Sequence, residues 1–154
     1  MTGPVRERVL AYLRAHHVMT LATQGPAGPW AAAVFYASEG LTLYFLSAPS
    51  TRHATELAGH ARVAATIQDD CADWAAIRGI QLEGQARELR GTQAERARTI
   101  YGAKFPSLGS PERAPAPIAA AFAKIRWYRI VPDRLYFVDN SLGFGHRDQL
   151  IPAG

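Results

Sequence analysis

Hydroxyl, guanidinium and imidazole groups crowd into one short stretch of this 154-residue chain. A β-rich run from Leu41 to Ser47 gives way there to a helical segment that includes Ala54. The junction carries the side chains of Ser47, Thr51, Arg52 and His53. Hydroxyls, a guanidinium and the free amide groups of a helix start are the donors that hold a phosphate group. Hydroxyls also cap ordinary helices, so the spacing alone leaves a phosphate site and a plain helix cap open.

Other side chains with chemical potential fit simpler explanations. His16 and His17 are adjacent at the C-terminal end of an expected helix, so they point in different directions and do not form a metal site. Cys71 stands among three aspartates without metal-ligand spacing, and acidic neighbours raise the pKa of a thiol. No nucleophile elbow or phosphate-binding P-loop pattern occurs. The sequence therefore predicts no metal and identifies no catalytic residue.

Composition describes an ordinary globular protein. Hydrophobic residues make up 48% of the chain and charged residues 19%, and the length suits one domain over residues 1–154. A single cysteine excludes an internal disulfide, which fits a reducing compartment. The amphipathic N-terminus does not read as a secretory signal, and the apolar runs are too short to span a bilayer. We therefore expect a cytoplasmic protein that has no membrane partner.

The charge balance is basic but dispersed. The formal net charge is +4 and the sequence pI is about 9.6, yet the arginines form no run. Nucleic-acid binders more often carry a clustered basic stripe, so we expect no nucleic-acid partner. A structural or nucleic-acid-binding barrel remains a hypothesis that rests on the pI alone. A modest preference for anionic ligands also fits the charge.

Periodicity and turn signals predict a mainly β chain with added helices. Thr2 is the expected cap of the first helix, Gly79 and Gly84 are expected bends in a long strand, and Thr92 with Glu95 forms a capping-box pattern. We expect helices at 4–16, 51–59, 92–103 and 118–124. We expect strands at 18–23, 30–38, 41–47, 62–67, 74–90, 125–131 and 135–139, with a hairpin turn at 39–40, a loop at 105–117 and a glycine-rich turn at 140–146. Six or seven strands with peripheral helices indicate a small β-barrel.

Several segments, in this order, resemble one known superfamily. They are Gly28 to Tyr36, Leu43 to Ser47, Thr51-Arg52-His53 and Ala61 to Ala64. Together they resemble the FMN-binding split-barrel superfamily, which includes pyridoxamine 5′-phosphate oxidase. Ile77 to Gly84 and Asp139 to Gly145 look closer to a group of small, uncharacterised bacterial members. The resemblance covers almost the whole chain and implies a split β-barrel.

The resemblance also implies a cofactor site for FMN. Its phosphate would be held by Ser47, Thr51, Arg52 and His53, with His53 standing where the oxidases have lysine. A mostly neutral histidine contributes less charge there. The flavin ring would lie along Ala32, Ala33, Val34, Phe45 and Leu46, although the alanines could instead pack against Trp30 or a helix. A second chain would complete the site through Asn140, Gly143 and Phe144, with His146 beside them. Arg78 would pass near the flavin or remain a solvated strand arginine.

The function that follows is a homodimeric, FMN-dependent oxidoreductase acting on an unknown small molecule. The oxidases carry a C-terminal Arg-x-His element, whereas this chain has Gly145-His146-Arg147, so we do not expect pyridoxamine phosphate as the substrate. The alternative is a non-enzymatic flavin- or haem-binding protein. Axial haem ligation would then come from histidines such as His53 or His146.

Overall fold

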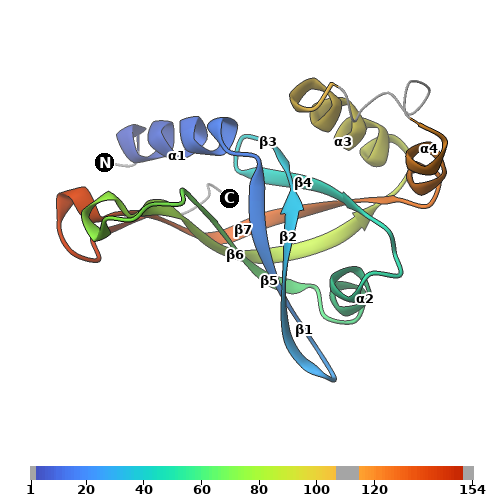
Figure 1. Ribbon diagram of the computed structural model, residues 1–154, viewed down its shortest axis with the longest axis horizontal. Helices are drawn as coiled ribbons and strands as arrows, with labels where there is room; N and C mark the ends of the chain where they lie inside the picture. The colour runs from blue at the N-terminus through green and yellow to red at the C-terminus, as the bar shows by residue number, and fades with distance from the viewer. Residues whose placement is uncertain (1–2, 107–114, 151–154) are drawn as a thin grey trace.

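The computed structural model describes residues 3–106 and 115–150. One antiparallel sheet dominates this part of the chain, with helices at its margins (Figure 1). Its strands are β1 (Val18–Gly25), β2 (Gly28–Phe35), β3 (Ala37–Glu39), β4 (Thr42–Ser47), β5 (Arg62–Gln68), β6 (Arg78–Leu89), β7 (Arg126–Asp139) and β8 (Arg147–Leu150). The helices are α1 (Gly3–Ala15), α2 (Arg52–Gly59), α3 (Gly91–Lys104) and α4 (Ala116–Phe122), with 3-10 turns η1 (Trp74–Ala76) and η3 (Asn140–Leu142).

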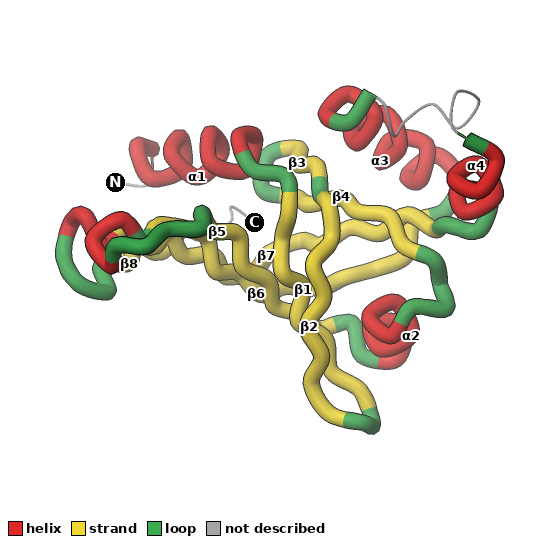
Figure 2. Tube along the Cα trace, viewed as in Figure 1, coloured by secondary structure: helices red, strands yellow, loops and turns green. Residues whose placement is uncertain are grey.

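The sheet is curled on itself (Figure 2). Its strand order is β2-β1-β5-β6-β7-β4-β3, with β8 paired to β7. Strands β2 and β3 stand at opposite ends of this order, yet only Tyr36 separates them in the chain. The two ends of the sheet must therefore approach each other, which is the geometry of a split barrel.

Two glycines of β6 make the curl possible, as the sequence predicted. A Cβ atom on Gly79 would lie 2.5 Å from the carbonyl oxygen of Ile67, and one on Gly84 would lie 2.2 Å from that of Val131. The β6–β7 register shifts between Glu83 and Gly84, where β7 accommodates Asp133 as an extra residue. Only glycine allows these backbones to come so close.

The core fills the inside of the curl. Its largest fully buried side chains include Tyr36, Phe45, Leu13 and Met19. Phe45 of β4 stacks on Tyr128 of β7, with ring centres 5.1 Å apart. Helix α1 covers part of the same core with one apolar stripe, as its periodicity predicted.

Several element predictions were wrong in detail. The expected strand 30–38 is interrupted at Tyr36, because β2 pairs with β1 whereas β3 pairs with β4. The expected strands 125–131 and 135–139 form the single strand β7. Pro132 and Asp133, which predicted a turn, instead lie at a bulge where Asp133 is an extra residue in the strand. Strand β8 was not predicted at all.

Helix starts were the other source of error. Helix α3 begins at Gly91 with Arg90 at its N-cap and no side-chain capping bond, so Thr92 is not the cap. Thr2 lies outside the described residues, as does 107–114 of the predicted loop. No helix of the described residues is long and apolar enough to cross a membrane.

Candidate functional site

Ser47, Thr51 and His53 meet where β4 ends and α2 begins. The Oγ atom of Ser47 lies 3.0 Å from Thr51 Oγ1 and 2.7 Å from His53 Nε2, and Thr51 Oγ1 lies 3.3 Å from the same nitrogen. Thr51 also accepts a hydrogen bond from the amide of Ala54 at 3.3 Å, so it caps the helix. From the residue spacing, a polar cluster and an ordinary helix cap were alternatives. In the structure Thr51 takes part in both.

The imidazole of His53 is a hydrogen-bonding group rather than a charge. Burial lowers its pKa from the ordinary value of 6.5, so the ring is neutral at pH 7. A serine hydroxyl 2.7 Å from an imidazole also has the spacing of a nucleophile and its base. Within the described residues no hydrogen bond joins His53 to a carboxylate, so the third group of an acyl-transfer triad is missing.

Arg52 points away from this cluster and is held in place by two other groups. Its Nε donates to Glu56 Oε2 at 3.0 Å, and its guanidinium lies 4.3 Å from the centre of the Trp30 ring. Glu56 in turn accepts a bond from Thr23 Oγ1 at 2.8 Å. These contacts tie the first turn of α2 to β1 and β2.

Glu56 is ionised in this cluster of Thr23, Trp30, Arg52 and Glu56, and Arg52 balances its charge. The Thr23 bond, followed by Arg52, holds the pKa of Glu56 below its ordinary value despite burial. Gly25 makes room for this side chain, because a Cβ there would lie 2.8 Å from Glu56 Cγ. The sequence analysis missed Glu56, Trp30 and Thr23. The Arg52–Glu56 spacing of four residues was the one local signal that could have found part of this cluster.

The residues predicted to lie along the flavin do not form one surface. On the edge strand β2, Ala32 and Val34 are half-buried, whereas Ala33 is exposed on the other face. On β4, Phe45 is fully buried in the core and offers only its backbone, whereas Leu46 is half-buried on the opposite face. The structure thus places the predicted strip on two faces of the curled sheet.

The turn at 140–146 lies far from the Ser47 cluster. Ser47 pairs with Arg126, the first residue of β7, and Asn140 follows the last residue of that strand. Fourteen residues at ~3.3 Å each give this strand a length of roughly 45 Å. Figure 1 shows the two regions at opposite ends of the molecule. One chain therefore cannot bring them to the same ligand.

Within that turn, Asn140 has a structural role. It donates to the carbonyl of Trp74 at 2.9 Å and accepts from the amide of Gly145 at 3.2 Å. Gly143 and Gly145 have positive φ angles, of 141° and 72°, which explains the glycines. Phe144 is 84% exposed and contacts the ring of Trp74.

Arg78 lies near this turn but not in it. Its Nε is 3.6 Å from Asp139 Oδ2, and its side chain is half-exposed. The Nε2 atom of His146 lies 3.3 Å from the Oδ2 atom of Asp148. Among the described residues, no group of three or more potential ligands gathers to hold a metal ion.

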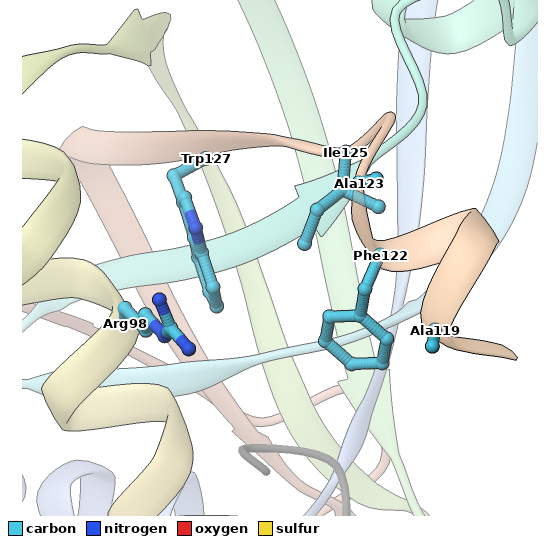
Figure 3. A pocket seen from close by; sticks show the side chains of 6 residues that line it. All are labelled: Arg98, Ala119, Phe122, Ala123, Ile125 and Trp127. Carbon is cyan, nitrogen blue, oxygen red and sulfur yellow. The ribbon is translucent and has the colours of Figure 1, made fainter. Parts of the chain in front are cut away.

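Among the described residues, hollows lie near the end of the sheet that carries the cluster. A groove of about 750 Å³ runs between α2 and β6–β7, with Ala54 and Leu57 on one side and Glu88 and Tyr128 on the other. A pocket of about 330 Å³ lies between α3, α4 and β7, and Figure 3 shows its side chains converging on the space. The residues lining it are Arg98, Ala119, Phe122, Ala123, Ile125 and Trp127.

The curled sheet, with its hydroxyl–imidazole cluster at the β4–α2 junction, defines a split-barrel protein. The family model of pyridoxamine 5′-phosphate oxidase matches residues 5–139. The chain therefore belongs to the pyridoxamine 5′-phosphate oxidase family, as the sequence motifs indicated. A UPF0306 protein of Enterobacter sp. (strain 638) is 34% identical over 138 residues, which are 88% of this chain and 89% of the relative.

Solved structures confirm the predicted fold class. A heme binding protein from Mycobacterium smegmatis superposes with a TM-score of 0.71 at 22% identity, covering 93% of this chain and 57% of that one. A FAD-binding protein from Mesorhizobium loti superposes with a TM-score of 0.64 at 17% identity, covering 84% and 90%. At these identities the similarity establishes the split-barrel architecture and not the ligand.

Proposed function

We propose that this protein binds FMN and acts as a flavin-dependent oxidoreductase on a small molecule. The observation that carries the proposal is the convergence of Ser47, Thr51 and His53 at the start of α2. Family membership supports a phosphate at this cluster, because the resemblance to the family implies that these positions hold the flavin phosphate.

The donor set suits a phosphate monoester. Two hydroxyls and an imidazole nitrogen lie within 3.3 Å of one another, and the first amides of α2 have no partners earlier in the helix. Phosphate oxygens accept hydrogen bonds from all three kinds of donor. The charge is less favourable, because His53 is neutral and Arg52 is paired with Glu56. The site thus favours phosphate mainly through hydrogen bonds.

We further propose that the site is completed in a homodimer. The distance along β7 supports this, since the turn at 140–146 could reach a flavin at the cluster only from a second chain. Exposed apolar side chains also support it. Trp74 and Phe144 are 59% and 84% exposed at that turn, and Phe35 is 50% exposed on the edge strand β2. Such patches are typical of surfaces that another protein covers.

In this proposal the flavin supplies the electron transfer, and the protein supplies binding and orientation. Ser47, Thr51 and His53 would hold the phosphate, and the small side chains of β2 would allow a flat ring to approach the backbone. No residue is assigned a catalytic role. The sequence Gly145-His146-Arg147 does not match the substrate-binding element of the oxidases, so pyridoxamine phosphate is not the proposed substrate.

A non-enzymatic flavin- or haem-binding role is the second candidate. It is favoured by the structural similarity to the heme binding protein from Mycobacterium smegmatis. In this chain an axial ligand would have to come from a histidine such as His53 or His146. His53 would first have to release its bond to Ser47.

A visible absorption spectrum decides between these candidates. We would record it on the purified protein and again after adding FMN, with riboflavin as a control that lacks only the phosphate. Flavin bands and a preference for FMN are the expected result. A Soret band would favour haem, and a colourless protein that takes up neither flavin would contradict the proposal. Light scattering with and without FMN tests the homodimer.

A further inference from the structure

The proposed phosphate site lacks a free positive charge among the residues that the motif supplies. His53 is neutral, and the guanidinium of Arg52 faces Glu56 and Trp30 rather than Ser47. A doubly charged phosphate is held more tightly by charge-assisted bonds than by neutral ones. Another cation close to the cluster would therefore matter for binding.

Strand pairing brings Arg126 to that position. On β4 and β7 the pair Phe45 and Tyr128 lies inside the barrel, where the two rings stack. Side chains alternate along a strand, so the pair two residues further on, Ser47 and Arg126, lies on the same face. Side chains directly opposite each other on one face have Cβ atoms about 5 Å apart. An arginine spans this distance easily.

The guanidinium of Arg126 is available for a ligand. It makes one hydrogen bond, from Nη1 to the carbonyl of the preceding Ile125 at 3.2 Å. Within residues 3–106 and 115–150 no ion pair joins it to a carboxylate, and the side chain is exposed. Its fold-stabilising contacts are therefore few.

An acidic group on this face of the sheet is already paired. Glu88 lies opposite Tyr128 on β6, and its carboxylate is 3.0 Å from Arg90. Burial raises the pKa of Tyr128, and Glu88 adds to that rise whereas Arg126 opposes it. Both charges therefore act on the tyrosine hydroxyl at this end of the barrel. With Glu88 paired to Arg90, Arg126 lies beside Ser47 with no ion-pair partner among the described residues.

We propose that Arg126 is a phosphate-binding residue of the FMN site, supplying from β7 the charge that His53 does not supply. This inference rests on the FMN-binding function proposed above. It assigns a role to a residue 79 positions from Ser47 in the chain, which strand register alone brings next to the cluster. The ligand group recognised is a phosphate monoester.

The test compares the affinities for FMN and riboflavin in Arg126→Gln and Arg126→Lys. The two ligands differ only in the phosphate, so the ratio of their dissociation constants isolates this group. We expect Arg126→Gln to weaken FMN binding about tenfold while riboflavin binding stays unchanged, and Arg126→Lys to restore most of the loss. FMN binding by the wild type should also weaken with added salt more steeply than binding by Arg126→Gln.

Arg134→Gln is the matched control. Arg134 is an exposed arginine in the other half of β7, 3.5 Å from Glu83. If Arg126→Gln and Arg134→Gln show the same FMN-to-riboflavin ratio as wild type, Arg126 is not a phosphate ligand. If the wild type binds FMN and riboflavin with equal affinity, the proposed phosphate site is contradicted, and the role of Arg126 is contradicted with it. If the wild type prefers FMN, and Arg126→Gln loses that preference whereas Arg134→Gln keeps it, both stand.

Discussion

The Nε2 atom of His53 lies 2.7 Å from the Oγ atom of Ser47, six positions earlier in the chain. This bond joins the first turn of α2 to the end of β4. It also places a neutral ring where the resembling oxidases carry a lysine. The charge and the protonation of residue 53 therefore bear on stability and, in the proposed function, on phosphate binding.

Replacing His53 by lysine should strengthen FMN binding by about tenfold, because an ammonium group forms a charge-assisted bond with phosphate. Flavin fluorescence quenching measures the dissociation constant. His60→Lys is the matched control, since His60 is exposed at the other end of α2. Equal affinities in the two variants would mean that residue 53 does not face the phosphate.

Stability without ligand should depend on the protonation of His53. Burial lowers its pKa from 6.5, so the unfolded chain binds the proton more tightly than the folded one. The contribution of His53 to the free energy of unfolding is therefore complete above about pH 6.5 and is lost as the pH falls through the lower folded pKa. Urea titrations of wild type and His53→Gln at several pH values check this. We expect the wild type to lose more stability on acidification, and parallel curves would contradict the assignment.

Removing Arg52 should affect both binding and folding. The sequence alone predicts that Arg52→Ala weakens FMN binding by about 1.5–3 kcal/mol, the range for a hydrogen bond to a charged group. The structure adds a lower urea midpoint, because Glu56 loses its ion-pair partner and Trp30 loses its stacked guanidinium. Arg14→Ala, at an exposed position in the last turn of α1, is the control. Full affinity in a folded Arg52→Ala protein would show that Arg52 does not bind the phosphate, which agrees with its contacts to Glu56 and Trp30.

The curl of the sheet should depend on Gly84. A methyl group there would lie 2.2 Å from the carbonyl oxygen of Val131, so the two backbones must separate. We expect Gly84→Ala to lower the free energy of unfolding by about 1–3 kcal/mol. Gly59→Ala, where no atom lies within 4 Å of the added carbon, should change it little. Urea denaturation of both variants measures the difference, and equal midpoints would show that the bulge tolerates a side chain.

Local sequence was sufficient for much of the site. The alternation from Leu41 to Ser47 and the polar start of α2 predicted a strand followed by a helix, and both are observed. Ser47, Thr51 and His53 are close in sequence, so one turn between two elements brings them together. Gly79 and Gly84 predicted bends because glycine within a strand marks close backbone approach.

Contacts between distant segments could not be predicted in this way. Thr23, Trp30 and Glu56 meet Arg52 only after β1, β2 and α2 pack, and this packing turns Arg52 away from the hydroxyls. The Pro132–Asp133 turn signal failed because pairing with β6 and β4 holds β7 continuous through a bulge.

The sequence by itself determined the mainly β barrel class and the hydroxyl–imidazole cluster, because each depends on periodicity or on near neighbours in the chain. Only the tertiary structure decided which charges face that cluster. It placed Arg126 opposite Ser47 and the 140–146 turn at the far end of β7, because strand register depends on the packing of the whole sheet.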